Sequence, residues 1–159
     1  MGYQHFEIVD ALLPIGTDVD AVLESGDEHA LFALWNTYHR VQFLHGVLDK
    51  IGDAESATEE KRAGLCAELA GLSVITATQA LQSNRRLIDL LIGRRWAVMR
   101  DIRETGGSWT AIGGALGMSK QGALDWYQRK IEQQEKYVGE WHDADRARAV
   151  VGEDLADEH

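Results

Sequence analysis

Residues 107–127 read Gly-Ser-Trp-Thr-Ala-Ile-Gly-Gly-Ala-Leu-Gly-Met-Ser-Lys-Gln-Gly-Ala-Leu-Asp-Trp-Tyr, and they predict two short helices joined by a tight turn. Ser108 and Ser119 are typical N-cap residues, because a serine hydroxyl accepts a hydrogen bond from an N–H of the first helical turn. Gly117 stands between the two helices, where the turn needs a left-handed backbone that glycine adopts without strain. Gly113 is expected where the helices cross closely, since a larger side chain would hold them apart.

The inward faces of the two helices follow from their apolar spacing. Ile112 and Leu116 lie one turn apart and face the core, and Met118 fills the corner between the helices. In the second helix, Ala123 and Trp126 are three residues apart and are expected to face inward too. The residues that this interpretation turns outward or sideways are Lys120, Gln121, Leu124, Asp125 and Gln128.

A helix-turn-helix of this kind places the N-terminal end of its second helix in the major groove of DNA. There Lys120 is expected to donate to guanine, Gln121 to pair with adenine, and Leu124 to touch a thymine methyl group. Phosphate contacts position a protein without reading sequence. The other predicted DNA-binding residues, most of them phosphate contacts, are Ser108, Thr110, Ser119, Gln128, Arg129, Lys130, Arg100 and Arg103. The alternative is a helical corner with no DNA role.

The run Ser-Trp-x-x-Ile-Gly-x-Ala-Leu-Gly-x-Ser-x-Gln, preceded by an arginine-rich segment, resembles small helix-turn-helix proteins of actinobacteria and their phages. Their DNA-binding domain is similar to region four of bacterial sigma factors. The resemblance covers residues 84–137 and implies a tri-helical DNA-binding domain. The family pattern more often has Arg-Gln-Ala where this chain has Lys120, Gln121 and Gly122. The lysine keeps the charge without the planar fork of arginine, and the glycine lowers helix stability by about 1 kcal/mol relative to alanine.

Charge is unevenly distributed along the chain. The formal net charge is −10, which argues against general coating of DNA. Residues 84–137 nevertheless hold ten Lys and Arg against six Asp and Glu, whereas residues 1–83 hold four against thirteen. Residues 138–159 hold two against seven. The only basic segment is therefore the one with the predicted motif, and we expect few phosphate contacts and a reliance on base contacts and dimerisation.

The composition limits the possible fold class and the possible cellular location. The chain has 159 residues, 45% of them hydrophobic, which is ordinary for a globular protein. The single proline and the long stretches between turn signals favour an all-α fold. No apolar run is long enough to span a membrane, and no signal peptide is evident. Cys66 is the only cysteine, so no internal disulfide forms and a cytoplasmic location is predicted. We expect the Cys66 thiol to be buried and inert, rather than a redox sensor.

We divide the chain into an N-terminal arm with a short helix (1–26), a helical dimerisation or partner region (27–83), a helix-turn-helix domain (84–138) and an acidic C-terminal tail (139–159). Each of the expected helices has a recognisable start or stop. In the first half we expect a short helix capped by Thr17 or Asp18, a broadly apolar helix over Asp27–Ile51, and a helix that opens with the capping box Ser56–Glu59 and ends near Ala70. In the second half we expect a long helix from Leu72 to Thr105, a second motif helix that reaches Val138, and a short helix within Glu140–Val151. Gly93 leaves open whether the long helix is continuous.

Other kinds of site are weighed and set aside. His29, His39 and His45 share one helix, but spacings of ten and six do not suit a metal pair, so no metal and no cofactor are predicted. No nucleotide loop or nucleophile motif appears, which predicts a protein that is not an enzyme. An aromatic set suggests either core packing or an effector pocket. Its members are Phe32, Trp35, Tyr38, His39 and Phe43.

The sequence as a whole predicts a DNA-binding transcriptional regulator, with repression as the expected effect. It would act as a homodimer on double-stranded DNA, and two-fold symmetry would make its operator palindromic. The alternative is an acidic helical adaptor, antitoxin-like or polymerase-binding, whose N-terminal region binds a protein partner and whose DNA-binding role is secondary.

Overall fold

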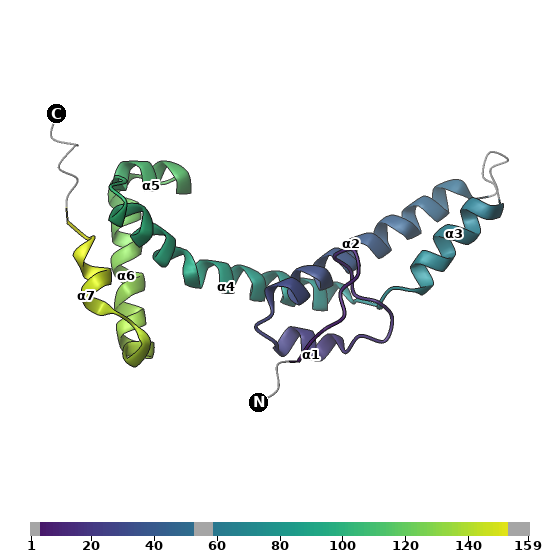
Figure 1. Ribbon diagram of the computed structural model, residues 1–159. Helices are drawn as coiled ribbons and strands as arrows, with labels where there is room; N and C mark the ends of the chain where they lie inside the picture. Colours follow the sequence, from purple (N-terminus) through teal and green to yellow (C-terminus); the bar gives the residue numbers. More distant parts are fainter. Residues whose placement is uncertain (1–3, 53–58, 153–159) are drawn as a thin grey trace. The chain divides into compact units, whose positions relative to one another are not determined.

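The computed structural model describes residues 4–52 and 59–152, and within them the chain is helical with no strand (Figure 1). The predicted all-α class is confirmed. The elements are α1 (Val19–Glu24), α2 (Glu28–Ile51), α3 (Glu59–Ala70), α4 (Ala77–Glu104), α5 (Trp109–Leu116), α6 (Lys120–Val138), the 3-10 turn η1 (Gly139–Trp141) and α7 (Ala144–Ala149). The chain forms two compact units, residues 1–90 (unit 1) and 91–159 (unit 2), and α4 contributes residues to both. None of the described helices is both long and apolar enough to cross a membrane.

The N-terminal arm is part of the core of unit 1. Leu13 is fully buried, and its N–H donates to the buried Thr37 hydroxyl of α2 at 2.8 Å. Its carbonyl accepts from the Ser73 N–H at 3.0 Å, and the Ser73 hydroxyl donates to the Pro14 carbonyl at 2.6 Å. The buried backbone of the arm is therefore hydrogen-bonded both to Thr37 and to Ser73, which adds to the apolar packing.

Helix α2 begins where the sequence predicts. The carboxylate of Asp27 accepts from the N–H groups of His29 and Ala30 at 2.9 and 3.1 Å, as an N-cap does. Its buried side includes Leu31 and Leu34. The buried Ser83 of α4 donates its hydroxyl to the Leu31 carbonyl at 2.5 Å, which joins α4 to α2. The core of unit 1 is completed by Phe6, Leu13, Val22, Ala30, Ala33, Ile75 and Ala80.

The expectation of a buried Cys66 is wrong, because its side chain is exposed. Helix α3 has no buried residue at all. Among the described elements its main neighbour is α2, with Arg40 and Glu68 paired at 2.6 Å between them, and a helix covered mainly from one side keeps much of its surface in solvent. The first three residues of the predicted capping box, 56–58, fall outside the described residues.

Helix α4 starts later than expected and passes through Gly93 without a break. Residues 72–76 are not helical, and the helix opens with a reciprocal capping box that the sequence analysis missed. The Gln79 N–H donates to the Thr76 hydroxyl at 3.1 Å, and the Thr76 N–H donates to the Gln79 amide oxygen at 2.9 Å. The Thr-x-x-Gln spacing is the signal that locates this start.

The inward face of α6 differs from the expectation in one residue. Ala123 is fully buried as predicted, but Tyr127 and not Trp126 is its fully buried neighbour, and Trp126 stays half-buried. Side chains three or four residues apart both lie on one helix face. The spacing from Ala123 therefore does not decide between Trp126 and Tyr127 as the inward residue. The buried Tyr127 hydroxyl has a partner, because it donates to the Ala147 carbonyl at 2.7 Å.

The first part of the predicted acidic tail is folded against unit 2. Ala147 is fully buried and Val150 nearly so. Two arginines of α7 bind carboxylates through two of their three guanidinium nitrogens, Nε and Nη2: Arg146 donates to Glu104 at 2.6 and 2.7 Å, and Arg148 donates to Glu135 at 2.6 and 2.6 Å. These charge-assisted hydrogen bonds hold the pKa of both carboxyl groups below the ordinary value. Residues 153–159 lie outside the described part of the chain.

Burial raises the pKa of Tyr127 to about 12, so the folded chain holds the phenol proton more tightly than the unfolded chain. The stability that this group contributes is complete below about pH 10 and is lost as the pH rises toward 12. We expect Tyr127→Phe to cost about 1 kcal/mol at pH 7 through the lost hydrogen bond. The variant should also lose less stability than the parent between pH 10 and 12, as measured by urea unfolding.

Tyr137→Phe is the matched control, because Tyr137 lies on the same helix and is 73% exposed. It should follow the parent at every pH. Parallel loss of stability in the parent and in Tyr127→Phe would contradict the assigned titration.

Candidate nucleic-acid interface

Helices α5 and α6 are joined by a turn whose caps follow the predicted pattern. The Ser108 hydroxyl accepts from the Ala111 N–H at 3.0 Å, and the Ser119 hydroxyl accepts from the Gly122 N–H at 3.0 Å. Gly117 ends α5 in the left-handed region, with φ 68° and ψ 31°. Each predicted cap and the predicted turn glycine are thus confirmed, and the start of α6 is fixed relative to the end of α5.

Gly113 gives this corner its close packing. It is buried, and a Cβ atom built on it would lie 2.7 Å from the Met118 carbonyl oxygen and 2.9 Å from that of Ser119. Both contacts are with backbone, which cannot rotate away as a side chain can. The Met118 N–H donates to the Gly113 carbonyl at 2.9 Å and closes the turn. A larger residue at this position therefore requires the backbone of the turn to shift.

Aromatic and arginine contacts support the corner from inside unit 2. Trp109 is fully buried, with its ring centroid 5.3 Å from that of Tyr127. The guanidinium of Arg103 lies 5.4 Å from the Trp109 ring centroid. It also donates to three carbonyl groups, those of Gly107, Val150 and Gly152, at 3.0, 3.2 and 3.0 Å. Arg103 thus ties the segment before α5 to the end of α7.

The first turns of α6 present polar side chains to solvent. Gln121, Asp125 and Arg129 are exposed, whereas Lys120 and Gln128 are half-buried. The Gln121 side-chain N–H donates to Asp125 Oδ1 at 2.7 Å, one helical turn away. This contact was not anticipated, although the spacing of four residues signals it. It orients the Gln121 amide and places a negative charge beside it.

The remaining predicted contact residues are distributed around this face. Ser108 and Ser119 use their hydroxyl oxygens as caps and keep the O–H as a donor, and Thr110 is exposed on α5. Leu124 is half-buried and packs on the core of unit 2, so only part of it faces outward. Lys130 lies over the Trp126 ring, 5.6 Å from its centroid.

Two cations lie near the Trp126 ring, and the sequence analysis missed both contacts. Arg95 of α4 lies 5.4 Å from its ring centroid, and Lys130 lies near the same ring. The Trp126–Lys130 spacing of four residues signals one of these contacts, but Arg95 comes from another helix. These contacts place the positive charges of Arg95 and Lys130 beside the Trp126 ring.

Arg100 is directed toward its own unit. Only 14% of its side chain is exposed, and it pairs with Asp101 at 3.0 Å and Glu104 at 3.8 Å. Phosphate contacts by Arg100 and Arg103 remain predictions. The geometry ranks both behind Arg129, which is exposed and has no ion-pair partner among the described residues.

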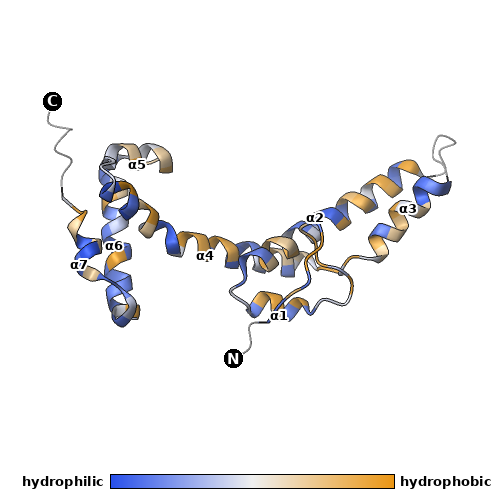
Figure 2. Cartoon of the chain, viewed as in Figure 1, coloured by the Kyte–Doolittle hydropathy of each residue, from blue (hydrophilic) through white to orange (hydrophobic). Residues whose placement is uncertain are grey.

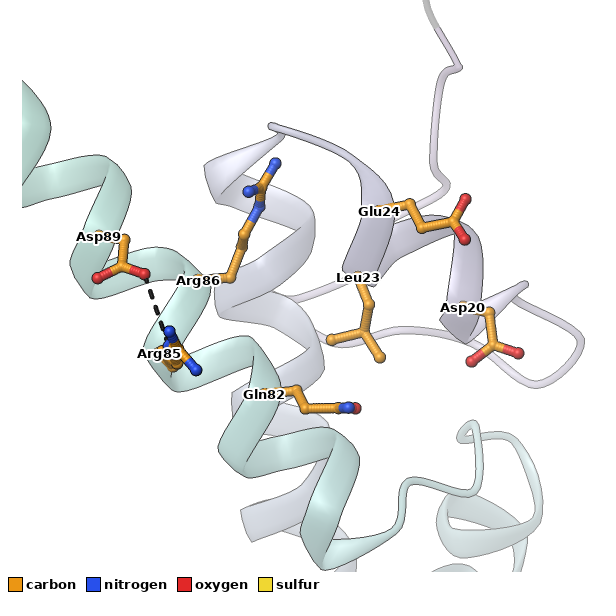
Figure 3. A pocket seen from close by; sticks show the side chains of 7 residues that line it. All are labelled: Asp20, Leu23, Glu24, Gln82, Arg85, Arg86 and Asp89. Atoms are coloured by element: carbon orange, nitrogen blue, oxygen red, sulfur yellow. Dashed lines mark ion pairs between the residues drawn. The ribbon is translucent and has the colours of Figure 1, made fainter.

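Two open hollows among the described residues of unit 1 carry mixed charge. One, of about 550 Å³, lies between α1 and α4 (Figure 3). Asp20 and Glu24 line it from α1, whereas Arg85, Arg86 and Asp89 line it from α4. An anion attracted by the arginines would be repelled by the carboxylates. Arg85 is itself paired with Asp89 at 3.8 Å, which further lowers the pull on an anion.

The second hollow, of about 610 Å³, lies beside the aromatic set of α2. It is lined by Asp10, Leu12, Asn36, His39, Arg40, Phe43 and Glu68. Of the five residues of the aromatic set, His39 and Phe43 line this hollow. Trp35 and Tyr38 pack against the core of unit 1 instead, and Phe32 is exposed. No group of three potential metal ligands occurs within residues 4–52 and 59–152.

Comparison of the chain with protein-family models, with curated proteins and with solved structures found no match. The interpretation of the α5–α6 corner therefore depends on its own geometry.

We expect Gly113→Ala to destabilise unit 2 by about 1–3 kcal/mol, because the new methyl group meets two backbone carbonyls and the turn must open. Chemical denaturation followed by far-UV circular dichroism measures this loss. Gly114→Ala is the matched control on the same helix, since nothing lies within 4 Å of a Cβ there. It should stabilise by up to about 1 kcal/mol through helix propensity. Equal stability of the two variants would show that Gly113 does not set the corner.

Proposed function

We propose that this chain is a sequence-specific, DNA-binding transcriptional regulator that acts as a cytoplasmic homodimer, with α5 and α6 as its helix-turn-helix. The observation that carries the proposal is the corner itself. Two serine caps, a left-handed Gly117 and the close approach at Gly113 fix α6 with its N-terminal polar side chains outward. The resemblance of residues 84–137 to actinobacterial and phage helix-turn-helix proteins agrees with this interpretation.

In the proposed complex the N-terminal end of α6 enters the major groove. Lys120 donates to guanine O6 or N7, and Gln121 pairs with the N6 and N7 edge of adenine. Thr110 and Arg129, both exposed, contact phosphates on either side. Leu124 offers an apolar edge to a thymine methyl group.

The charge distribution favours specific contacts to bases over a general affinity for DNA. Asp125 and Glu132 are exposed on α6 among the cations, and residues 1–83 carry a net charge of −9. Both features oppose the phosphate backbone and lower affinity for random DNA. A regulator built in this way depends on its specific contacts and on two-fold symmetry.

The second candidate is an adaptor that binds a protein through unit 1. The observation that favours it is the apolar side of α2 left open to solvent, where Phe32 is 50% and Phe43 57% exposed. In this function a different protein would bind unit 1 and cover the Phe32 and Phe43 rings.

Selection of bound sequences from random duplex DNA, at about 150 mM salt to screen weak phosphate attraction, tests the proposal. The expected result is an enriched palindrome whose half-sites lie about one helical turn apart. Failure of folded protein to enrich any sequence would overturn the regulator proposal in favour of the adaptor.

Lys120→Ala and Gln121→Ala should each weaken binding to the selected operator by about 1–3 kcal/mol, because each removes a contact to a base edge. Fluorescence anisotropy with the operator and with one-base variants measures the loss and identifies the base that each residue contacts. Gln133→Ala is the matched control, an exposed polar residue three turns along α6. If both substitutions leave operator binding at the level of the control, the base-contact assignment fails.

Asp125→Asn should strengthen binding to random duplex DNA about two- to tenfold, since it removes a negative charge next to the phosphates. The asparagine keeps an oxygen to accept from Gln121. Asp145→Asn removes an equal charge from α7 and serves as the control. Titrations at several salt concentrations compare the two, and identical gains would mean that Asp125 does not face the DNA.

A further inference from the structure

The second hollow of unit 1 is formed by three segments of the chain. Its volume of about 610 Å³ lies within the range of small-molecule sites. The N-terminal arm contributes Asp10 and Leu12, α2 contributes a row of side chains, and α3 contributes Glu68. Both polar and apolar residues line it, and Figure 2 shows the same mixture of hydrophilic and hydrophobic residues along α2. We call this cavity the α2 hollow.

A tight turn in the arm places Asp10 in the wall of the α2 hollow. The Val9 N–H donates to the Leu12 carbonyl at 3.0 Å, and the Leu12 N–H donates to the Val9 carbonyl at 2.9 Å. Between them, Asp10 and Ala11 have φ of 53° and 61°, in the left-handed region that alanine rarely adopts. The Asn36 side-chain N–H donates to the Ala11 carbonyl at 3.4 Å, so α2 helps to hold the turn. Backbone in such a conformation persists where the surrounding contacts fix it, and it is frequent at binding sites.

The charged groups that line the α2 hollow leave an excess of negative charge. Arg40 is matched by Glu68, to which it donates at 2.6 Å, and this hydrogen bond holds the pKa of the Glu68 carboxyl below its ordinary value. Asp10 is exposed and has no ion-pair partner among the described residues. Residues 1–83 carry a net charge of −9, so the wider field of unit 1 also attracts cations. The hollow therefore favours a cation over an anion.

Hydrogen-bond acceptors without a described partner line the same hollow. They are the Asp10 carboxylate, the Asn36 amide oxygen and a nitrogen of the His39 ring, since a neutral imidazole has one acceptor. The His39 ring is held by edge contacts with Trp35 and Tyr38, at 4.4 and 5.3 Å between ring centroids. A ligand that satisfies these acceptors must donate hydrogen bonds, as an ammonium or guanidinium group does.

Phe43 and Leu12 are the apolar residues of the α2 hollow. Phe43 is 57% exposed, and Leu12 is half-buried. The Arg40 guanidinium lies 5.3 Å from the Phe43 ring centroid, so this ring already has one cation beside it. The electrons of an aromatic face attract positive charge, and the ring also offers apolar surface to the body of a ligand.

We propose that the α2 hollow binds a small organic cation, an amine or guanidine that carries an apolar group. The cationic head donates hydrogen bonds to Asp10 and to the acceptors of Asn36 and His39, and the apolar body lies on Leu12 and Phe43. This site goes beyond the proposed function, because binding of such a ligand to unit 1 requires no DNA.

Titration of the full chain with phenethylamine, followed by amide NMR, tests the site. Phenethylamine is a cation at neutral pH and carries one aromatic ring. We expect a Kd of about 1 mM or below, the range open to so small a ligand, with the largest shifts at the arm turn and along α2. Phenethyl alcohol has a similar shape without the charge, and phenylpropionate has the opposite charge, so both should bind at least about tenfold more weakly. No saturable shift with phenethylamine, or equal affinity for phenylpropionate, would overturn the proposal.

Asp10→Asn removes the unmatched charge and keeps the turn, because asparagine tolerates left-handed backbone as aspartate does. It should weaken the binding of phenethylamine at least about tenfold. Asp49→Asn is the matched control, since it removes an equal charge from an exposed residue of α2 that does not line the hollow. Its affinity should stay within about twofold of the parent, because solvent screens an exposed charge. Equal affinities of the parent and Asp10→Asn would overturn the assignment.

The site and the regulator fail independently of each other. A chain that selects an operator but binds no amine would refute the site and leave the regulator, whereas a chain that binds the amine and selects no sequence would do the reverse.

Discussion

The contact between the Cα of Gly113 and the backbone of the following turn is the constraint on which unit 2 depends. With no side chain there, the carbonyls of Met118 and Ser119 approach α5 closely, and the turn closes on the Gly113 carbonyl. Ser119 then starts α6 at a fixed distance from α5. The outward direction of the polar residues at the start of α6 is thus a consequence of one missing Cβ.

Helix α4 carries the second constraint, because it supplies side chains to two separate cores. Its first half gives the buried Ser83 hydroxyl to α2, and its last half gives Met99 and Arg103 to unit 2. Each of the two cores therefore depends on different residues of the same helix.

Local signals in the sequence were sufficient for the helices, the caps and the turn. The serine caps and Gly117 depend on neighbours within four residues, and a single sequence carries that information. Contacts between distant residues were not predictable in the same way. Arg103 binds carbonyls more than 40 residues away, and nothing in the pattern distinguishes it from a phosphate-binding arginine. Cys66 was misplaced because an apolar neighbourhood in the sequence does not reveal how many helices pack around it.

The hydrogen bonds of the N-terminal arm also order events during synthesis. Leu13 and Pro14 are held by Ser73, and Leu31 is held by Ser83, so partners are separated by 50 to 60 residues. A ribosome adds roughly 5–20 residues each second, which leaves the inner side of α2 uncovered for some seconds until α4 emerges. The α5–α6 corner, whose caps and turn are all local, forms without such a delay. The excess negative charge of residues 1–83 makes two such chains repel each other during the interval in which this apolar surface is exposed.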